Sequence, residues 1–422
     1  MVLSNEKNIM DKSILIFFAT PVFLILILIE YLYGYKIGKN NYRLNDTFTS
    51  ISLGLISRFP TILNLGFQSA AFIYAADQFN LRLLANDSAL TWIIAFFLYD
   101  LSYYWMHRLH HEIKLLWATH VVHHHGEDFN LATALRQTSS GFLWKWIFFV
   151  PMIAIGIPVD VFVSVAGVNL VYQFWVHTKH IGHLGFLEKI FITPMNHSIH
   201  HAKNKEYIDA NYGGVFIIWD RMFGTYIPER ADIKPIYGTV KPLNSWNPIW
   251  ANLQVFYQMI KDTIKTKNIS DKLKIWYGST HWLPDDLERN RNIITAENFS
   301  EKYNPRISND QKLFGLVQLF LIIFISFYVS LTLSEQTIME TAIFGLVIVL
   351  SATITSMLFQ GSEIAYKLHF LLSIVTIFAI YVTNYINLTL VAAQLISLQA
   401  VLNIFFVSLL KPINNLLKTK NT

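Results

Sequence analysis

Long apolar runs constrain this chain more than any other feature. Residues 13–33, 313–333, 341–359, 370–386 and 388–410 are almost free of charged side chains. A helix of about 20 apolar residues spans a hydrocarbon layer of roughly 30 Å. Only 14% of the chain is charged, against about 25% in ordinary soluble domains. The sequence therefore predicts an all-α integral membrane protein.

Four further runs raise the predicted number of crossings to nine. They are residues 61–76, 89–106, 142–157 and 159–176. The last two are expected to form a hairpin that crosses the membrane or dips into one leaflet.

The positive-inside rule orients these crossings. Lys36, Lys39 and Arg43 lie in a short connection and are expected in the cytoplasm. Counting from there puts the N-terminus outside and the lysine-containing tail after Leu410 inside. The first run resembles a retained anchor, because it is too long for a signal peptide and lacks a small-residue cleavage site.

Four regions follow from these patterns. We expect N-terminal membrane helices in residues 1–88, a catalytic core in 89–230, a cytoplasmic helical extension in 231–312 and four membrane helices in 313–422. Polar residues of the last region are expected to hydrogen-bond between helices. They are Gln318, Asn384, Asn387, Gln394, Gln399 and Asn403.

Two absences narrow the chemistry. The chain has no cysteine, so disulfides, thiolate-ligated haem and cysteine-bound iron–sulfur clusters are excluded. The net charge is +5, and no basic stripe with interleaved aromatic residues indicates nucleic-acid binding. Redox chemistry in this chain would have to use histidine and carboxylate ligands.

Histidine clustering is the strongest functional signal. Of the 15 histidines, 13 lie between His107 and His201, in clusters of the form His-x-x-His-His. Residues three or four apart share a helix face, so His107 and His111 can hold one ion, as can His120 with His123 or His124. Adjacent helical residues diverge by roughly 100° and can serve two ions. The pattern predicts a dinuclear metal site in a cytoplasmic cap.

The number of imidazoles favours iron. Neutral nitrogen ligands suit iron, zinc and copper, but zinc takes about four ligands and has no redox chemistry. Eight or more histidines exceed one structural zinc site. Two ions with open positions can bind and reduce dioxygen, and a site just beneath the membrane surface is accessible to a lipid chain.

Two carboxylates are candidate catalytic residues. Asp100 shares a helical stripe with His107 and His111, and it is expected to accept the second ring N–H of a ligating histidine. The alternative is an aspartate that reaches towards water. Glu112 follows His111 directly and is expected to bridge or orient, unless it is only an exposed glutamate. Four histidines break the spacing and are expected to be bystanders: His110, His125, His180 and His183.

The sequences around the histidines resemble a known family. The segments are residues 100–108 (DLSYYWMHR), 120–124 (HVVHH), 129–137 (FNLATALRQ), 211–225 (NYGGVFIIWDRMFGT) and 241–250 (KPLNSWNPIW). They resemble the fatty acid hydroxylase/sterol desaturase superfamily of membrane di-iron enzymes, and within it the alkylglycerol monooxygenases. The resemblance is dense over about residues 89–290. Asn196 departs from it, since a further histidine is expected there.

This resemblance implies an activity and a ligand set. Such enzymes hydroxylate the ether-linked carbon of alkylglycerol lipids with dioxygen, using tetrahydrobiopterin as an external reductant, and release a fatty aldehyde. Glu112 matches a glutamate that the family needs for activity. The implied ligands of two iron ions are His107, His111, His120, His123, His124, His177, His197, His200 and His201.

Two other functions are compatible with the sequence. One is a sterol, fatty acid or sphingolipid hydroxylase or desaturase that receives electrons from a separate protein. The other is a metal transporter or sensor, although the histidines cluster at predicted helix ends rather than at the bilayer midplane. The enzyme is expected in the endoplasmic reticulum of a eukaryote or the inner membrane of a bacterium, with its site facing the cytoplasm.

Overall fold

The protein is all-helical, as the sequence predicts. The computed structural model describes residues 2–63, 65, 68–79, 81, 84, 88–287, 300–381 and 388–410. Within these ranges, β-structure is limited to isolated bridges. The helices are α1 (Val2–Lys36), α2 (Leu44–Ile56), α3 (Phe59–Ile62), α4 (Gln68–Phe79), α5 (Ala89–Glu112), α6 (Lys114–His124), α7 (Leu131–Ala134), η1 (Gly141–Leu143), η2 (Lys145–Phe149), α8 (Val150–Ala154), α9 (Val159–Trp175), η3 (Gly185–Lys189), α10 (Pro194–His200), α11 (Ile218–Phe223), α12 (Pro248–Lys265), α13 (Ile269–Tyr277), α14 (Asn309–Thr332), α15 (Ile338–Phe359), α16 (Ile364–Tyr381) and α17 (Leu390–Leu410).

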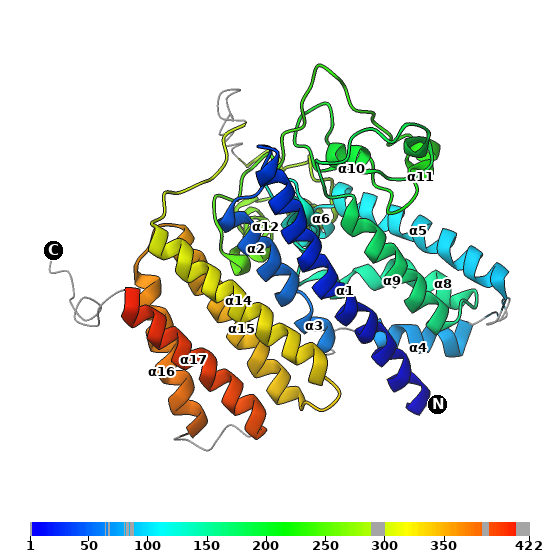
Figure 1. Cartoon of the computed structure of the whole chain (residues 1–422). Helices are drawn as coiled ribbons and strands as arrows, with labels where there is room; N and C mark the ends of the chain where they lie inside the picture. Colours follow the sequence, from blue (N-terminus) through cyan, green and yellow to red (C-terminus); the bar gives the residue numbers. More distant parts are fainter. Residues whose placement is uncertain are drawn as a thin grey trace.

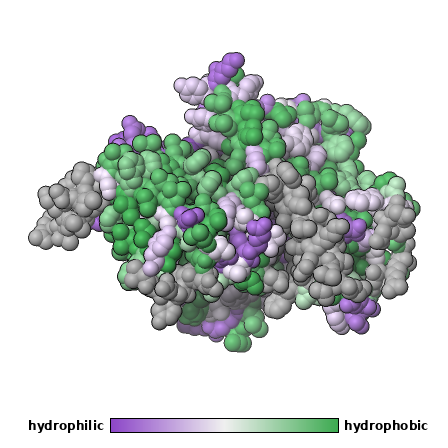
Figure 2. Space-filling view, turned by 60° about the horizontal axis from the view of Figure 1, so that its bottom comes forward, coloured by the Kyte–Doolittle hydropathy of each residue, from purple (hydrophilic) through white to green (hydrophobic). Residues whose placement is uncertain are grey.

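Five helices are long and apolar enough to cross a membrane. Among the described residues these are the stretch Ala19–Lys36 of α1 and the four helices α14 to α17. Their outer faces carry exposed leucine, isoleucine, valine and phenylalanine side chains. Figure 2 shows hydrophobic residues spread over much of one face of the molecule. A membrane protein is therefore supported, whereas the nine-crossing topology and the cytoplasmic orientation stay predictions.

Two predicted crossings are not continuous helices. The run 61–76 is divided between α3, which ends at Ile62, and α4, which begins at Gln68. The run 142–157 is divided among η1, η2 and α8, and Pro151 stands at the start of α8, where its missing N–H costs no helical hydrogen bond. The 12 residues of α4 extend only about 18 Å at 1.5 Å per residue. The tail after Leu410 lies outside the described residues.

The C-terminal helices pack as two antiparallel pairs, α14 with α15 and α16 with α17 (Figure 1). Two of the predicted interhelical bonds are present, from Gln318 Nε2 to Asn403 Oδ1 at 2.6 Å and from Gln399 Nε2 to Ser351 Oγ at 3.1 Å. Asn384 and Asn387 lie outside the described residues. Because α2 packs against α14 and α15, this bundle supports the histidine-bearing region from one side.

The histidine-bearing region is built on α1, α5, α6 and α9. Helix α9 packs against both α1 and α5, and α5 packs against α6. In Figure 1 the histidine-bearing α6 and α10 lie near the upper ends of these helices. The site is thus at one end of the helix bundle, in agreement with the sequence.

Candidate metal centre

A sharp corner between α5 and α6 brings the first two histidine clusters together. Ile113 is the single residue between the helices, and its extended backbone (φ −102°, ψ 125°) ends one helix and begins the next. The corner is fixed from outside, because Lys114 N donates to Gly278 O and Thr280 N donates to Glu112 O. The histidines of the last turns of α5 therefore face those of α6.

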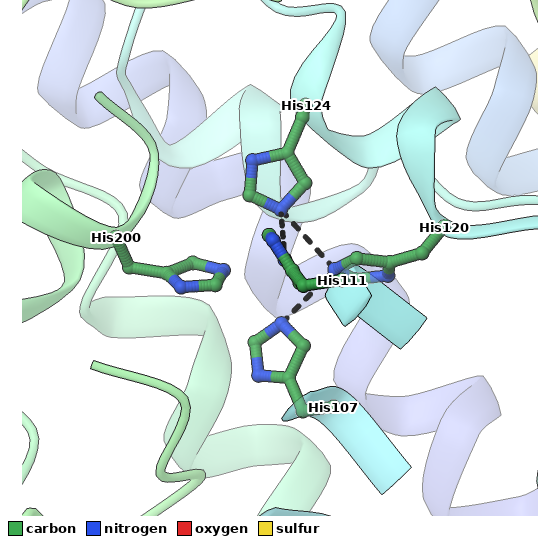
Figure 3. Close-up of side chains that lie close together, drawn as sticks. All are labelled: His107, His111, His120, His124 and His200. Atoms are coloured by element: carbon green, nitrogen blue, oxygen red, sulfur yellow. Dashed lines mark hydrogen bonds between the residues drawn. The ribbon is translucent and has the colours of Figure 1, made fainter. Parts of the chain in front are cut away.

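Nine buried histidines form two groups with converging ring nitrogens. In each group, one potential ligand atom per residue lies within 4.8 Å of all the others. Figure 3 shows the first group, in which five rings from α5, α6 and α10 point to a common centre. We call these the first and second groups. The first contains His107, His111, His120, His124 and His200, and the second contains His123, His177, His197 and His201.

The grouping follows helical periodicity. The i, i+4 pairs His107–His111 and His120–His124 both enter the first group, whereas His123 turns to the second. His197 of α10 and His201, which caps that helix, enter the second group. All nine residues that the resemblance implied as ligands are present, and each belongs to one group. Their role as ligands stays a prediction.

Backbone carbonyls fix the tautomers of four of these histidines. The Nδ1 atoms of His107, His123, His177 and His200 lie 2.8, 3.1, 2.8 and 2.9 Å from carbonyl oxygens. A carbonyl can only accept, so each Nδ1 carries the proton and each Nε2 presents a lone pair. The Nε2 atoms of His123 and His177 are nevertheless 3.4 Å apart, with no proton between them. Two facing lone pairs are the arrangement that a bound cation requires.

Burial keeps these imidazoles neutral. It lowers the pKa of His120, His123 and His197 well below the usual value, and neighbouring histidines lower it further. Burial also lowers the pKa of His177 to about 4. Neutral imidazole is the form that binds metal ions. The buried Nε2 of His200 has no hydrogen-bond partner within the described part of the chain. The two groups therefore fit two metal ions.

Comparison with known proteins agrees with this centre. Residues 92–225 match the fatty acid hydroxylase family. Alkylglycerol monooxygenase of Xenopus tropicalis is 36% identical over 328 residues, which cover 76% of this chain and 72% of that protein. This chain belongs to the alkylglycerol monooxygenase family.

Other relatives give the same result. The alkylglycerol monooxygenase of Danio rerio is 37% identical over 343 residues, covering 80% of this chain and 76% of that protein. The human protein of the same name is 36% identical over 327 residues, covering 77% and 71%. The resemblance that the motifs predicted is confirmed. No solved structure matches this member of the alkylglycerol monooxygenase family.

Asp100 contacts the loop after Tyr212 rather than a histidine ring. Its oxygens accept hydrogen bonds from the backbone N–H groups of Val215 and Phe216 at 2.8 and 2.9 Å, from Trp219 Nε1 at 3.0 Å and from Asn169 Nδ2 at 2.8 Å. The predicted contact with a ligating histidine is not among the hydrogen bonds of the described residues, because backbone carbonyls take that role. Asp100 instead stabilises the loop after Tyr212.

Glu112 lies at the surface of the α5–α6 corner. Its side chain is 43% exposed and accepts a 2.8 Å hydrogen bond from Arg108 Nε. It belongs to neither histidine group. The structure thus gives Glu112 an ion pair, and leaves its predicted role in catalysis untested.

The four predicted bystanders are absent from both groups. His110 is buried, with its Nδ1 2.6 Å from Met106 O, and His125 is also buried. His180 packs edge-on against Tyr33, and His183 is exposed and ion-paired to Glu188 and Glu229. Asn196, where a histidine was expected, is a buried structural residue whose amide donates to Phe191 O.

Sequence reasoning missed the residues that hold the rings in place. A second buried carboxylate, Asp220, accepts hydrogen bonds from Tyr212 N and Gly213 N at 2.7 and 2.9 Å. Phe129 contacts three rings of the second group, and Trp117 contacts three of the first. For Asp220 and Phe129 only their position within the family motifs indicated a role, and Trp117 lies outside those motifs.

Gly214 is required by the close approach of this loop to α5. A Cβ atom there would lie 2.7 Å from Asp100 Oδ1 and 2.9 Å from Tyr103 Cδ1. We expect Gly214→Ala to destabilise the protein by about 1–3 kcal/mol, as overpacking does, and to lower its thermal unfolding midpoint in detergent. Gly182→Ala is the control, since no atom of the described residues lies within 4 Å of its Cβ position. Equal midpoints for the two variants would contradict this account.

Proposed function

We propose that this chain is a membrane di-iron monooxygenase that hydroxylates the ether-linked carbon of alkylglycerol lipids. The two groups of converging ring nitrogens, four of which are Nε2 atoms left without a proton by Nδ1–carbonyl contacts, are the observation that carries the proposal. The named activity of the relatives supports the substrate class. The hydroxylated carbon then belongs to a hemiacetal, which collapses to a fatty aldehyde and a glycerol product.

The proposed reaction balances with a two-electron donor. One oxygen atom of dioxygen enters the C–H bond beside the ether oxygen, and the other leaves as water. Reduced tetrahydrobiopterin supplies the two electrons from outside the chain. The iron ions, when bound, supply the binding and reduction of dioxygen.

The protein's own residues hold the centre and keep water from it. The nine histidines are proposed to bind the two ions, and the Nδ1 protons of four of them are held on backbone carbonyls. Asp100 positions the loop 212–216 from which Tyr212 O contacts His107. Glu112 is proposed to act through Arg108 and the α5–α6 corner. We propose that the centre faces the cytoplasm, beside the membrane from which the lipid enters.

Metal analysis is the first test. We expect about two iron ions per chain when detergent-purified protein from iron-replete medium is measured by elemental mass spectrometry. Less than half an iron per chain, without zinc in its place, would remove the basis of the proposal.

The substrate and donor are tested on the iron-loaded protein. We expect fatty aldehyde from an alkylglycerol with reduced tetrahydrobiopterin, and none from the diacyl analogue, which lacks the ether carbon. Turnover with reduced ferredoxin but not with pterin would favour the alternative of a lipid hydroxylase served by an electron-transfer protein.

A further inference from the structure

Four consecutive residues, the segment 209–212, contact three rings of the first histidine group. Two of the contacts come from backbone carbonyls and the third from a carboxylate. The pairs are Ala210 O with His200 Nδ1 at 2.9 Å, Tyr212 O with His107 Nδ1 at 2.8 Å and Asp209 Oδ1 with His111 Nδ1 at 3.4 Å. One short segment thus sets the orientation of most of the first group.

The segment adopts a backbone conformation that needs support from its surroundings. Asp209 and Asn211 both have positive φ, 60° and 57°, which is uncommon for residues other than glycine. Such conformations persist where neighbouring structure holds them, often at functional sites. Here Asn211 is fully buried, and its amide donates to Asn196 O and Ile227 O at 3.1 and 2.9 Å.

Asp209 differs in kind from the other ring partners. Within the described part of the chain, it is the one carboxylate within 4 Å of a ring nitrogen of either histidine group. Its other oxygen accepts a 2.9 Å hydrogen bond from His281 Nε2. His281 lies two residues after Ser279, which forms an isolated β-bridge with Ile113 at the α5–α6 corner. The carboxylate is therefore held between His111 and a residue tied to that corner.

We propose that Asp209 is a positioning residue for the first histidine group, and that His281 holds its carboxylate in place. A carboxylate on the second ring nitrogen fixes the orientation of a ligating histidine and makes it a stronger donor. The four carbonyl-held histidines lack such a negative charge. The proposal rests on the proposed function in one respect, because the first group must hold a metal ion. It implies that the two ions are inequivalent, with the first bound through a more strongly donating His111.

Cobalt substitution tests the inference without any turnover. The full-length protein is loaded with Co²⁺, and its visible absorption and its loss of metal to a chelator are followed. Asp209→Asn and Asp209→Gly both remove the negative charge, and both residues tolerate positive φ. We expect one of the two ions to leave roughly 10–100-fold faster in both variants, with a changed cobalt spectrum, while the other leaves at the wild-type rate.

Two further variants make the test specific. His281→Ala should shift the same ion in the same direction by a smaller factor, because the carboxylate remains. His183→Ala removes a similarly exposed, ion-paired histidine that belongs to neither group, and should change neither ion. Thermal unfolding midpoints identify any general loss of structure, and Asp209→Gly removes the side chain without straining the backbone.

The outcomes separate this inference from the proposed function. A wild-type protein that binds no metal would overturn both. The wild-type protein could hold two ions while Asp209→Asn and Asp209→Gly release them at wild-type rates and with an unchanged cobalt spectrum. That outcome would overturn the role of Asp209 alone. Faster loss of both ions to the same extent would also overturn it, since the ring contacts of this segment among the described residues are all with the first group.

Discussion

Replacing His123 with alanine is expected to abolish lipid oxidation and to lower the metal content by about one ion per chain. The second group has only four ligand candidates, so the variant retains three. The Nε2 lone pair of His177, which faces His123 at 3.4 Å, would then lack its counterpart across the ion. Elemental mass spectrometry and aldehyde release from an alkylglycerol measure the two effects on one preparation.

Two bystander histidines provide matched controls for His123→Ala. His110 is as deeply buried as the ligand candidates, at 1% exposed, but belongs to neither group, so His110→Ala tests for loss of packing alone. His183→Ala tests an exposed position. Both variants should keep two ions per chain. If either control lost as much metal as His123→Ala, the division between ligands and bystanders would be wrong.

The histidine pattern was informative because the helices that carry it are regular. Spacing of four places His107 above His111 and His120 above His124, and the roughly 100° step from one helical residue to the next turns His123 away from His124. These relations are local to α5 and α6. They hold whatever the rest of the chain does, so the sequence alone could predict two ions.

The parts that the sequence did not reveal depend on contacts between distant segments. Ring orientation depends on carbonyls, and every residue has a carbonyl, so the partners Ala210 and Tyr212 have no side-chain signature. Asp209 follows the nearest histidine of the first group by nine positions and contacts His111 only because α10 and its following loop fold over α5. The expectation for Asp100 failed for the same reason: helical spacing gave its face but not its partners.

Apolar runs predicted most of the long helices, but not every run is one continuous helix. Long runs such as α14 and α15 are single helices, as expected. The run 142–157 is equally apolar, but it is divided near Pro151, a residue that begins a helix more readily than it continues one. Its side chains Phe149, Met152 and Ile153 are buried against neighbouring helices. Hydropathy could not distinguish contact with lipid from contact with protein.

Arg136→Met is expected to destabilise the protein by about 3–5 kcal/mol, the typical cost of breaking a buried ion pair. Arg136 is 1% exposed, and its guanidinium donates to Asp46 Oδ1, Ser50 Oγ and Val122 O at 3.1, 3.2 and 3.1 Å. Methionine fills much of the space but leaves the buried Asp46 carboxylate without its ion-pair partner. Because Arg136 O also holds His123 Nδ1, the change should affect the second histidine group as well.

The destabilisation should depend on pH in a defined direction. Burial raises the pKa of Asp46 to about 6, even though Arg136 lowers it. Removing the guanidinium removes that lowering influence, so the pKa in the variant rises further. A carboxyl whose pKa is higher in the folded state contributes stability that is fully present below the unfolded pKa of about 3.9 and is lost as pH rises through the folded value. Arg136→Met should therefore be closer to wild type at pH 5 than at pH 8.

A double variant isolates the buried charge as the cause. Asp46→Asn combined with Arg136→Met leaves no carboxylate at position 46 to ionise. The difference between its unfolding midpoint and that of wild type should therefore stay the same between pH 5 and pH 8, whereas the difference for Arg136→Met alone grows. At pH 8 the double variant should unfold at a higher temperature than Arg136→Met alone. Thermal unfolding of the three proteins in one detergent measures the order of midpoints. An Arg136→Met deficit of equal size at both pH values would mean that lost packing, rather than the unpaired charge of Asp46, dominates.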